Sequence, residues 1–345
     1  MPFLFESVQK VTRPALKVAV LGGGSWATAI VKILSTNLKK VYWWVREPEI
    51  LEGVREHGHN PLYLNEAELH HKHISISNNL KLVVKKADVI VIVIPSAYVF
   101  NTLSLLPTNA FEDKLVISAT KGILPESMET VTTFVKNTFC VPLNRLGIIV
   151  GPSHAEEIAR ERLTYLTSAS ENQKLAEDVA NLFRNRYVIT NISDDMTGIE
   201  FSVVLKNIYA LAAGIFRGLG AGDNLMAVFN TNCVQEMLNI ISAISNDREH
   251  RVATSPYLGD FLVTTYSQYS RNRNFGFMIG KGYSVQTVHM EMKMVAEGHT
   301  AAYCMYHLNQ SQYHLDLPIL NATYRILYEK AVVRTTIKRL LDYLK

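Results

Sequence analysis

Residues 17–30, KVAVLGGGSWATAI, join a short apolar run to a glycine-rich turn and then to a helical pattern. Within this stretch Gly22, Gly24 and Ala27 fit the spacing G-x-G-x-x-G/A of a strand-to-helix junction. The first glycine allows a tight turn, the second lets the backbone approach a pyrophosphate, and a small third residue lets the helix pack closely. Ser25 stands where the helix begins, so free amide groups there point toward an anion. The stretch therefore predicts a dinucleotide-binding turn.

Beyond this turn, β-branched runs alternate with helical patterns up to about residue 191. The runs that we expect to be strands are Lys17–Leu21, Val41–Val45, Ile74–Ser77, Val89–Ile94, Leu115–Ala119, Leu146–Val150, Leu163–Ser168 and Tyr187–Thr190. Several are apolar at consecutive positions, as in strands buried on both faces of a parallel sheet. The expected helices between them are Ala27–Leu38, Tyr98–Leu106, Glu126–Phe139, Ala155–Arg162 and Gln173–Arg184. This alternation predicts an α/β fold with a Rossmann-type, doubly wound, mostly parallel sheet.

After Asp195 the strand signals nearly stop. A 3.6-residue apolar period follows at Phe201, Val204, Leu205, Ile208, Ala212 and Ile215. Asp223–Ser245 and Ile319–Leu344 also have helical patterns. We therefore expect an NAD(P)-binding domain over residues 1–194, followed by an all-helical substrate and catalytic domain over residues 195–345.

Composition excludes several classes of protein. Apolar residues make up 48% of the 345 residues and charged residues 19%, which excludes a disordered, collagen-like or coiled-coil chain. The net charge of +4 is too small to indicate nucleic-acid binding. Cys140, Cys233 and Cys304 suggest no disulfide framework, the N-terminus lacks the pattern of a secretion signal, and the most apolar run, Val89–Phe100, is too short to span a bilayer. We expect a cytoplasmic protein without a membrane span.

The end of the second strand, W43-W-V-R-E-P48, bears on the choice of cofactor. An acidic residue that closes this strand favours NAD through the ribose hydroxyls, whereas an arginine suits the 2′-phosphate of NADP. Here Arg46 occupies the position and Glu47 lies one residue later. The expectation is therefore NAD or NADP, with NADP or the use of both favoured.

Two segments have the chemistry of an anion site. Lys121 directly follows the strand Leu115–Ala119, at the edge where open α/β sheets bind ligands, although a surface lysine in a loop is the alternative. The run S270-R-N-R-N-F-G276 concentrates guanidinium and amide donors that suit a phosphate or carboxylate, with a solvated basic loop as the alternative. Asp260 could anchor a lysine or accept a substrate hydroxyl.

Lys206 interrupts an apolar helical stretch, F201-S-V-V-L-K-N-I-Y-A-L-A-A-G214. Its neighbours on the same helix face are small, namely Ser202, Ala210, Ala213 and Gly214. Small neighbours leave room for a ligand beside the ammonium, and a buried lysine has a lowered pKa that suits proton transfer. The alternative is a lysine at the helix margin that reaches solvent.

Together these segments resemble NAD(P)-dependent glycerol-3-phosphate dehydrogenase, the soluble enzyme of the bacterial type. The resemblance runs from about Leu16 to Leu344. It rests on VLGGGSWATA, IPS (94–96), ATKG (119–122), VGPSHAEEIA (150–159), VLKNIYALAAG (204–214), LGD (258–260), SRNRNFG (270–276) and VAEG (295–298). It implies the reversible reduction of dihydroxyacetone phosphate to sn-glycerol 3-phosphate, a precursor of phospholipids.

The resemblance also implies roles for residues of this chain. Lys206 matches the general acid and base, and Lys121 matches a lysine that touches substrate and cofactor. Asn207, Asp260 and Thr264 match the polar surroundings of the catalytic lysine. The implied substrate contacts are Lys121, Gly151, Ser153, Lys206, Asp260, Ser270, Arg271 and Asn272. The implied cofactor contacts are Gly22, Gly24, Ser25, Trp26, Arg46, Lys121, Ala155, Arg271, Val295 and Glu297. A homodimer and a small phosphorylated substrate are the implied partners, and no role is transferred to Asn232.

Three other functions remain possible from the residues alone. A 3-hydroxyacid or 6-phosphogluconate-type dehydrogenase also uses a helical lysine, but often with an asparagine one turn beyond it, where this chain has Ala210. A silent NAD(P)-binding sensor would not need both Lys121 and Lys206. A sugar-nucleotide dehydrogenase would need a cysteine nucleophile, whereas Cys233 lies in a predicted helix as a core residue. The histidines of H70-H-K-H73 are expected to face solvent, and no metal is expected.

Overall fold

The computed structural model describes residues 16–245, 252–292 and 295–345. Residues 1–15 lie outside the described residues. The prediction that the N-terminus carries no secretion signal falls on this segment. Two compact units are present. One contains the chain up to Thr120 together with Val131–Met196, and the other contains Lys121–Thr130 together with Thr197–Lys345. The division into residues 1–194 and 195–345 stays a prediction, and the packing groups residues 121–130 with the helices.

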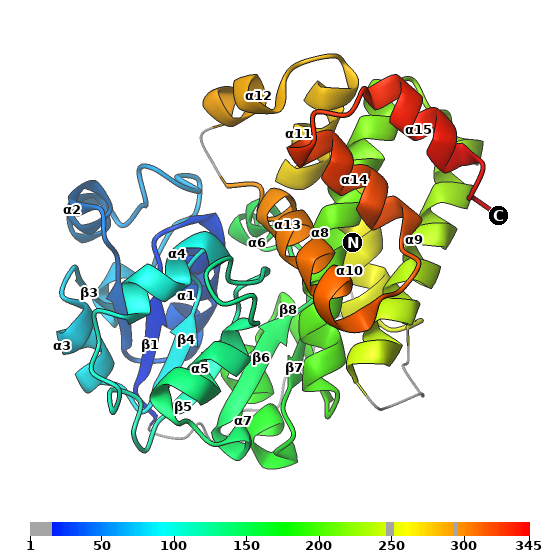
Figure 1. The fold of residues 1–345 in the computed structure, drawn as a ribbon. Coiled ribbons are helices and arrows are strands. Elements are labelled where there is room, and N and C mark those ends of the chain that lie inside the picture. The colour runs from blue at the N-terminus through cyan, green and yellow to red at the C-terminus, as the bar shows by residue number, and fades with distance from the viewer. Residues whose placement is uncertain (1–15, 246–251, 293–294) are drawn as a thin grey trace. The chain divides into compact units, whose positions relative to one another are not determined.

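In the described part of the first unit, eight strands form one sheet in the order β3-β2-β1-β4-β5-β6-β7-β8 (Figure 1). The strands are β1 Val18–Leu21, β2 Val41–Trp44, β3 Ile74–Ser77, β4 Val89–Ile92, β5 Leu115–Ser118, β6 Leu146–Val150, β7 Thr164–Ala169 and β8 Val188–Ser193. All neighbours are parallel except β6 and β7. The predicted mostly parallel sheet is confirmed, with every predicted strand within three residues of its observed ends.

The strand order reverses beside β1. Leu21, the last residue of β1, is in register with Trp44 of β2 on one side and Ile92 of β4 on the other. The glycine-rich turn therefore leaves the sheet at the carboxyl edge, at the point where open α/β sheets bind their ligands. Right-handed crossovers then place the helices that follow β1 and β4 on opposite faces of the sheet.

The helices of the first unit are mostly where the pattern predicts them. They are α1 Ser25–Asn37, α2 Pro48–His57, η1 His71–His73, α3 Leu80–Lys85, α4 Ser96–Leu103, α5 Val131–Phe139, η2 Leu143–Arg145, α6 Ala155–Ala159 and α7 Gln173–Phe183. The helix predicted over Glu126–Phe139 begins only at Val131. Met128 has a positive φ of 55°, and Ile123 forms a β-bridge with Thr130, so the chain turns back before the helix starts.

The second unit is helical throughout its described residues apart from loops and that bridge. It contains α8 Met196–Gly218, α9 Asp223–Ile244, η3 Ser255–Gly259, α10 Asp260–Tyr266, α11 Arg271–Gly280, α12 Val285–Glu291, α13 Glu297–Leu308, η4 Asn309–Tyr313, α14 Pro318–Tyr328 and α15 Val333–Leu341. The single helix predicted over Ile319–Leu344 is two helices, with Lys330 at a φ of 54° between them. Among the described residues only α8 is long and apolar enough to cross a membrane, and 94% of its most apolar window is buried, as in a core helix.

Glycines bring α8 and α11 into backbone contact. A Cβ atom on Gly276 would lie 1.8 Å from a carbonyl oxygen of α8, and one on Gly214 would lie 2.0 Å from a carbonyl oxygen of α11. Gly218 and Gly280 meet in the same way one turn further along. Each helix thus carries two glycines four residues apart, and this pairing holds the first turn of α11 at a fixed place beside α8.

A buried carboxylate joins α9 to α14. Glu236 accepts hydrogen bonds from the backbone amides of Ile319 (2.8 Å) and Leu320 (2.9 Å), in the first turn of α14. A carboxylate at this position satisfies amides that have no partner inside their own helix. Burial nevertheless raises the pKa of Glu236 from 4.5 to about 7.

Candidate active site

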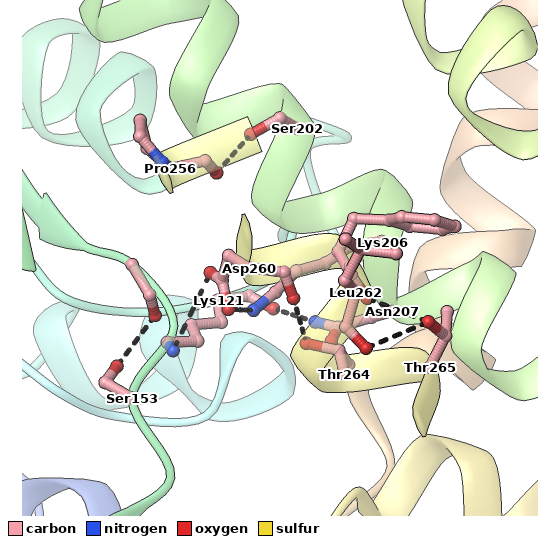
Figure 2. A network of polar contacts seen from close by, with 12 residues as sticks. Lys121, Ser153, Ser202, Lys206, Asn207, Pro256, Asp260, Leu262, Thr264 and Thr265 are labelled. Carbon is pink, nitrogen blue, oxygen red and sulfur yellow. Dashed lines mark hydrogen bonds and ion pairs between the residues drawn. The ribbon is translucent and has the colours of Figure 1, made fainter. Parts of the chain in front are cut away.

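Lys206 of α8 and Asp260 of α10 form a direct salt bridge through Nζ and Oδ1, and their side chains are only 4% and 1% exposed (Figure 2). The ammonium of Lys121 lies 3.9 Å from the other carboxylate oxygen, Oδ2. One carboxylate thus faces two ammonium groups. A buried charge is tolerated when it is paired in this way, and the positive charge in excess favours an anionic ligand.

The environment of Lys206 lowers the pKa of its ammonium from 10.5 to about 7. Burial is the largest cause, since it disfavours the charged form, and the charge of Lys121 acts in the same direction. The carboxylate of Asp260 opposes both by raising the pKa. Lys206 can therefore give up or take a proton close to neutral pH, as a general acid and base must.

A chain of amide hydrogen bonds links four segments around this pair. Asn207 donates from Nδ2 to the carbonyl oxygen of Lys121 over 2.6 Å. Asn272 of α11 donates to Oδ1 of Asn207 over 2.9 Å, and its own Oδ1 accepts from the amide of Gly298 over 2.8 Å. The two asparagines therefore set the positions of the Lys121 loop, α8, α11 and the first turn of α13.

Gly298 is a residue that sequence reasoning missed. A Cβ atom there would lie 2.3 Å from the carbonyl oxygen of Asn207, so any side chain would push α13 away from α8. The signal was available in V295-A-E-G298, where a glycine follows the acidic residue of the motif. Its contact with Asn207, however, joins residues far apart in the sequence, which local patterns do not show.

The remaining predicted residues of the second unit lie on the same elements. The hydroxyl of Thr264 donates to the backbone carbonyl of Asp260 over 2.5 Å. Ser270 caps α11 by accepting from the amide of Arg273 over 3.3 Å, and Arg271 is the first residue of that helix. Glu297 is likewise the first residue of α13, two residues after Val295.

The small residues on the same helix face as Lys206 do not all leave room for a ligand. Ala210 and Ala213 are buried, and the space beside Gly214 is filled by the backbone of α11. The expectation that these small residues leave room for a ligand is wrong at Gly214. Gly214 admits α11 instead, and that helix carries Arg271 and Asn272.

The glycine-rich turn of the first unit has the geometry that its sequence predicts. Gly22 has a φ of +134°, and a Cβ atom there would lie 2.4 Å from the carbonyl oxygen of Val93. Gly24 caps α1, and no atom lies within 4 Å of its Cβ position, so the backbone there is open to a ligand. Ser25 begins α1, and the indole of Trp26 donates to the carbonyl oxygen of Ala119 over 2.9 Å.

Asn60 supports this turn and was not predicted. Its buried amide nitrogen donates to the carbonyl oxygen of Gly23 (2.9 Å) and to the hydroxyl of Thr28 (2.7 Å). Its oxygen accepts from the backbone amides of Leu62 and Tyr63. Asn60 belongs to the segment 57–73, which contains none of the motifs on which the resemblance rests. The histidines of that segment at 70, 71 and 73 are exposed, as expected.

The other predicted residues of the first unit lie in loops or at helix starts. Gly151 has a φ of +138°, with its Cβ position 2.6 Å from the carbonyl oxygen of Tyr165, and Ser153 donates to the carbonyl oxygen of Gly151 over 2.8 Å. Ala155 is the first residue of α6. Arg46 is exposed after β2 and bonds to its neighbour Glu47.

Two family descriptions match this chain. "NAD-dependent glycerol-3-phosphate dehydrogenase N-terminus" matches residues 17–176, and "NAD-dependent glycerol-3-phosphate dehydrogenase C-terminus" matches residues 195–338. The chain belongs to this family. The resemblance seen in its motifs is confirmed, as are its Rossmann-type fold and its class as an NAD(P)-dependent oxidoreductase.

Individual members of the glycerol-3-phosphate dehydrogenase family align over nearly the whole chain. The glycerol-3-phosphate dehydrogenase [NAD(P)+] of Limosilactobacillus reuteri is 34% identical over 95% of this chain and 97% of its own length. That of Staphylococcus carnosus is 31% identical over 94% and 97%. A crystal structure of the Coxiella burnetii glycerol-3-phosphate dehydrogenase superposes with a TM-score of 0.88 at 26% identity, covering 94% of this chain and 98% of that one.

Family membership removes the alternatives drawn from the residues alone. The cysteine nucleophile of a sugar-nucleotide dehydrogenase is also opposed by the structure, because Cys233 is fully buried and burial raises the pKa of its thiol. A thiol held in its neutral form is a poor nucleophile. Cys233 is a core residue of α9, as expected.

Proposed function

We propose that this chain interconverts dihydroxyacetone phosphate and sn-glycerol 3-phosphate with NAD(P)(H), and so supplies glycerol 3-phosphate for phospholipid synthesis. The carrying observation is the buried Lys206–Asp260 pair with Lys121 beside it. An ammonium with a pKa of about 7, next to a second cation, suits proton transfer to the carbonyl oxygen of an anionic substrate. The family match supplies the identity of that substrate.

In this proposal Lys206 is the catalytic acid and base. Its ammonium donates a proton to the carbonyl oxygen as the ketone is reduced, and the neutral amine takes the proton back from the hydroxyl in the reverse direction. Before proton transfer, the ammonium also stabilises the negative charge that develops on that oxygen. Asp260 keeps the ammonium oriented and opposes the loss of its proton in the absence of substrate. The nicotinamide, when bound, supplies or accepts the hydride.

The anionic end of the substrate needs a second set of donors. Ser270 caps α11, and Arg271 and Asn272 begin it, so the positive end of the helix dipole adds to the guanidinium and the amide. One amide hydrogen of Asn272 is already donated to Asn207. We therefore assign to Asn272 both the positioning of Asn207 and the binding of the phosphate. Lys121, Gly151 and Ser153 complete the proposed substrate contacts.

The residues present fit a dinucleotide. The φ of Gly22 and its close approach to Val93 require glycine there, and the open Cβ position of Gly24 leaves room for a ligand beside the backbone. We assign cofactor binding to Gly22, Gly24, Ser25, Trp26, Arg46, Lys121, Ala155, Arg271, Val295 and Glu297. Homodimeric assembly, a cytoplasmic location, and the division into a cofactor domain (1–194) and a catalytic domain (195–345) belong to the same proposal.

Initial rates of NADH and NADPH oxidation by the purified protein test the reaction. Dihydroxyacetone phosphate should support turnover, whereas the keto products of 3-hydroxyacid and 6-phosphogluconate dehydrogenases should not. Turnover of either of those controls, with none of dihydroxyacetone phosphate, would refute the proposed substrate. Light scattering of the same sample measures whether the protein is a dimer.

A further inference from the structure

The carboxylate of Glu47 lies against the glycine-rich turn. Glu47 directly precedes α2 and caps its start without a side-chain hydrogen bond to that helix. Its Oε2 atom lies 3.2 Å from the Cβ position of Gly23, the middle glycine of the turn. The two other nearest atoms belong to the apolar side chains of Ile50 and Val45. Glu47 follows by one residue the position where an acidic side chain usually closes the second strand. Its carboxylate nevertheless lies beside the glycine-rich turn.

The guanidinium of Arg46 is engaged by this same carboxylate. Arg46 donates from Nε (3.1 Å) and from Nη2 (2.6 Å) to Oε1 of Glu47. The side chain of Arg46 is 72% exposed, whereas that of Glu47 is 22% exposed. The arginine therefore lies on the solvent side of the pair, and the carboxylate faces the turn.

This arrangement distinguishes the two cofactors by charge. An acidic side chain at this edge of a dinucleotide-binding sheet accepts hydrogen bonds from the ribose hydroxyls of NAD. In NADP a phosphate replaces the 2′-hydroxyl, so a donor becomes a dianion beside a partly buried carboxylate, and like charges repel. Arg46 could bind that phosphate only by giving up its bonds to Glu47.

We propose that Glu47 sets the cofactor preference of this chain, in favour of NAD(H) over NADP(H). Taken alone, Arg46 points toward NADP in the sequence, but its pairing with Glu47 reverses that expectation. The proposal rests on the dinucleotide site of the proposed function and is independent of the substrate.

Direct binding tests the proposal without turnover. We expect titrations monitored by the fluorescence of the dihydronicotinamide to give a Kd for NADH at least about tenfold below that for NADPH. In Glu47→Gln the ratio of the two constants should shift toward NADPH by about tenfold or more, since the repulsion is removed and Arg46 is released. Arg46→Ala should weaken the binding of NADPH more than that of NADH, because only NADPH carries the 2′-phosphate that the guanidinium could bind.

Glu49→Gln is the matched control, because Glu49 is an exposed carboxylate in the first turn of the same helix. It should leave both constants unchanged, and thermal melting should show that all variants fold. Equal wild-type affinities, a Glu47→Gln ratio within about twofold of wild type, or no binding of either dinucleotide would overturn the proposal. A normal Glu47 effect on binding, with no reduction of dihydroxyacetone phosphate, would uphold it and refute the proposed function instead.

Discussion

Lys206 and Asp260 are ion-pair partners that expose almost none of their side chains, 4% for the lysine and 1% for the aspartate. Breaking a buried pair leaves one charge uncompensated and is costly. Such a pair is nevertheless retained here beside a second lysine. Its consequences for the reaction can be measured separately from its consequences for folding.

Replacement of Lys206 should remove the proton donor and leave the cofactor site intact. We expect Lys206→Ala to lower kcat by about 10²–10⁴-fold. NADH should still bind, because the glycine-rich turn is unchanged. Steady-state rates and fluorescence titration measure the two effects. A near-normal rate with dihydroxyacetone phosphate would refute the assignment of Lys206.

Lys32 provides a matched control for this variant. It is also a buried lysine paired with a carboxylate, at 3.4 Å from Glu161. Lys32→Ala should lower the thermal stability while kcat stays within about threefold of wild type. An equal loss of kcat in both variants would mean that Lys206 matters for folding rather than for chemistry.

The lowered pKa of Lys206 predicts opposite pH profiles for the two directions. Reduction requires the ammonium, so its kcat/KM should be constant below about pH 7 and fall about tenfold per unit above it. Oxidation requires the neutral amine and should fall on the acid side instead. Because Asp260 raises the pKa of Lys206, Asp260→Asn should move the break in both profiles to lower pH. A break that does not move would show that another group titrates.

Loss of the Arg271 guanidinium should weaken the grip on the phosphate. We expect Arg271→Ala to raise KM for dihydroxyacetone phosphate by about tenfold or more, because bidentate charge-assisted bonds to phosphate are lost. Arg325→Ala, which removes an exposed guanidinium on α14, serves as the control and should leave KM unchanged. An unchanged KM in Arg271→Ala would refute the phosphate site at the start of α11.

The crossing of α8 and α11 should not tolerate a methyl group. Gly276→Ala places a Cβ atom 1.8 Å from a backbone oxygen, so the helices must separate, at a cost of about 3 kcal/mol or more. Gly222→Ser is the control, because nothing lies within 4 Å of its Cβ position and serine is a good helix cap. Urea unfolding of both variants measures the difference. Equal stabilities would contradict the close contact.

Glu236 should make stability depend on pH in a defined window. Its pKa is about 7 in the folded protein and near 4.5 in the unfolded chain, so the folded state holds the extra proton between these values. Stability from this group is therefore complete below about pH 4.5 and is lost as the pH rises through 7. Relative to Glu236→Gln, the free energy of unfolding of the wild type should fall by on the order of 2–3 kcal/mol across that window. A constant difference would refute the raised pKa.

Local patterns predicted the strands better than the loops around them. Consecutive apolar residues, as in β4, identify a buried strand directly, since both faces of the sheet are covered. The helices α2 and α3 were missed because they are short and mostly polar on their outer sides. The predicted helices break at Met128 and Lys330, where φ is positive. Methionine and lysine rarely adopt a positive φ, so the sequence does not indicate these breaks.

The residues of the candidate site also fall into two groups, those that local sequence patterns predict and those that only the fold reveals. The spacing of Gly22 and Gly24 by itself predicts a dinucleotide-binding turn. The apolar helix around Lys206 by itself predicts that this lysine is buried. Asn60, Gly298 and Glu47 act instead through contacts across 37, 91 and 24 residues of sequence, respectively, to Gly23, Asn207 and Gly23. No periodicity encodes such distances, so only the folded chain reveals them.

The path of the chain around Lys121 has a consequence for how such proteins diversify. Residues 121–130 pack with the helices, although sheet strands precede and follow them in the sequence. A recombination event that joined a foreign cofactor-binding half at residue 195 would remove Lys121 and the carbonyl that accepts from Asn207. A helical fragment that begins at residue 197 would therefore lack Lys121, one of the two lysines that we propose for the active site.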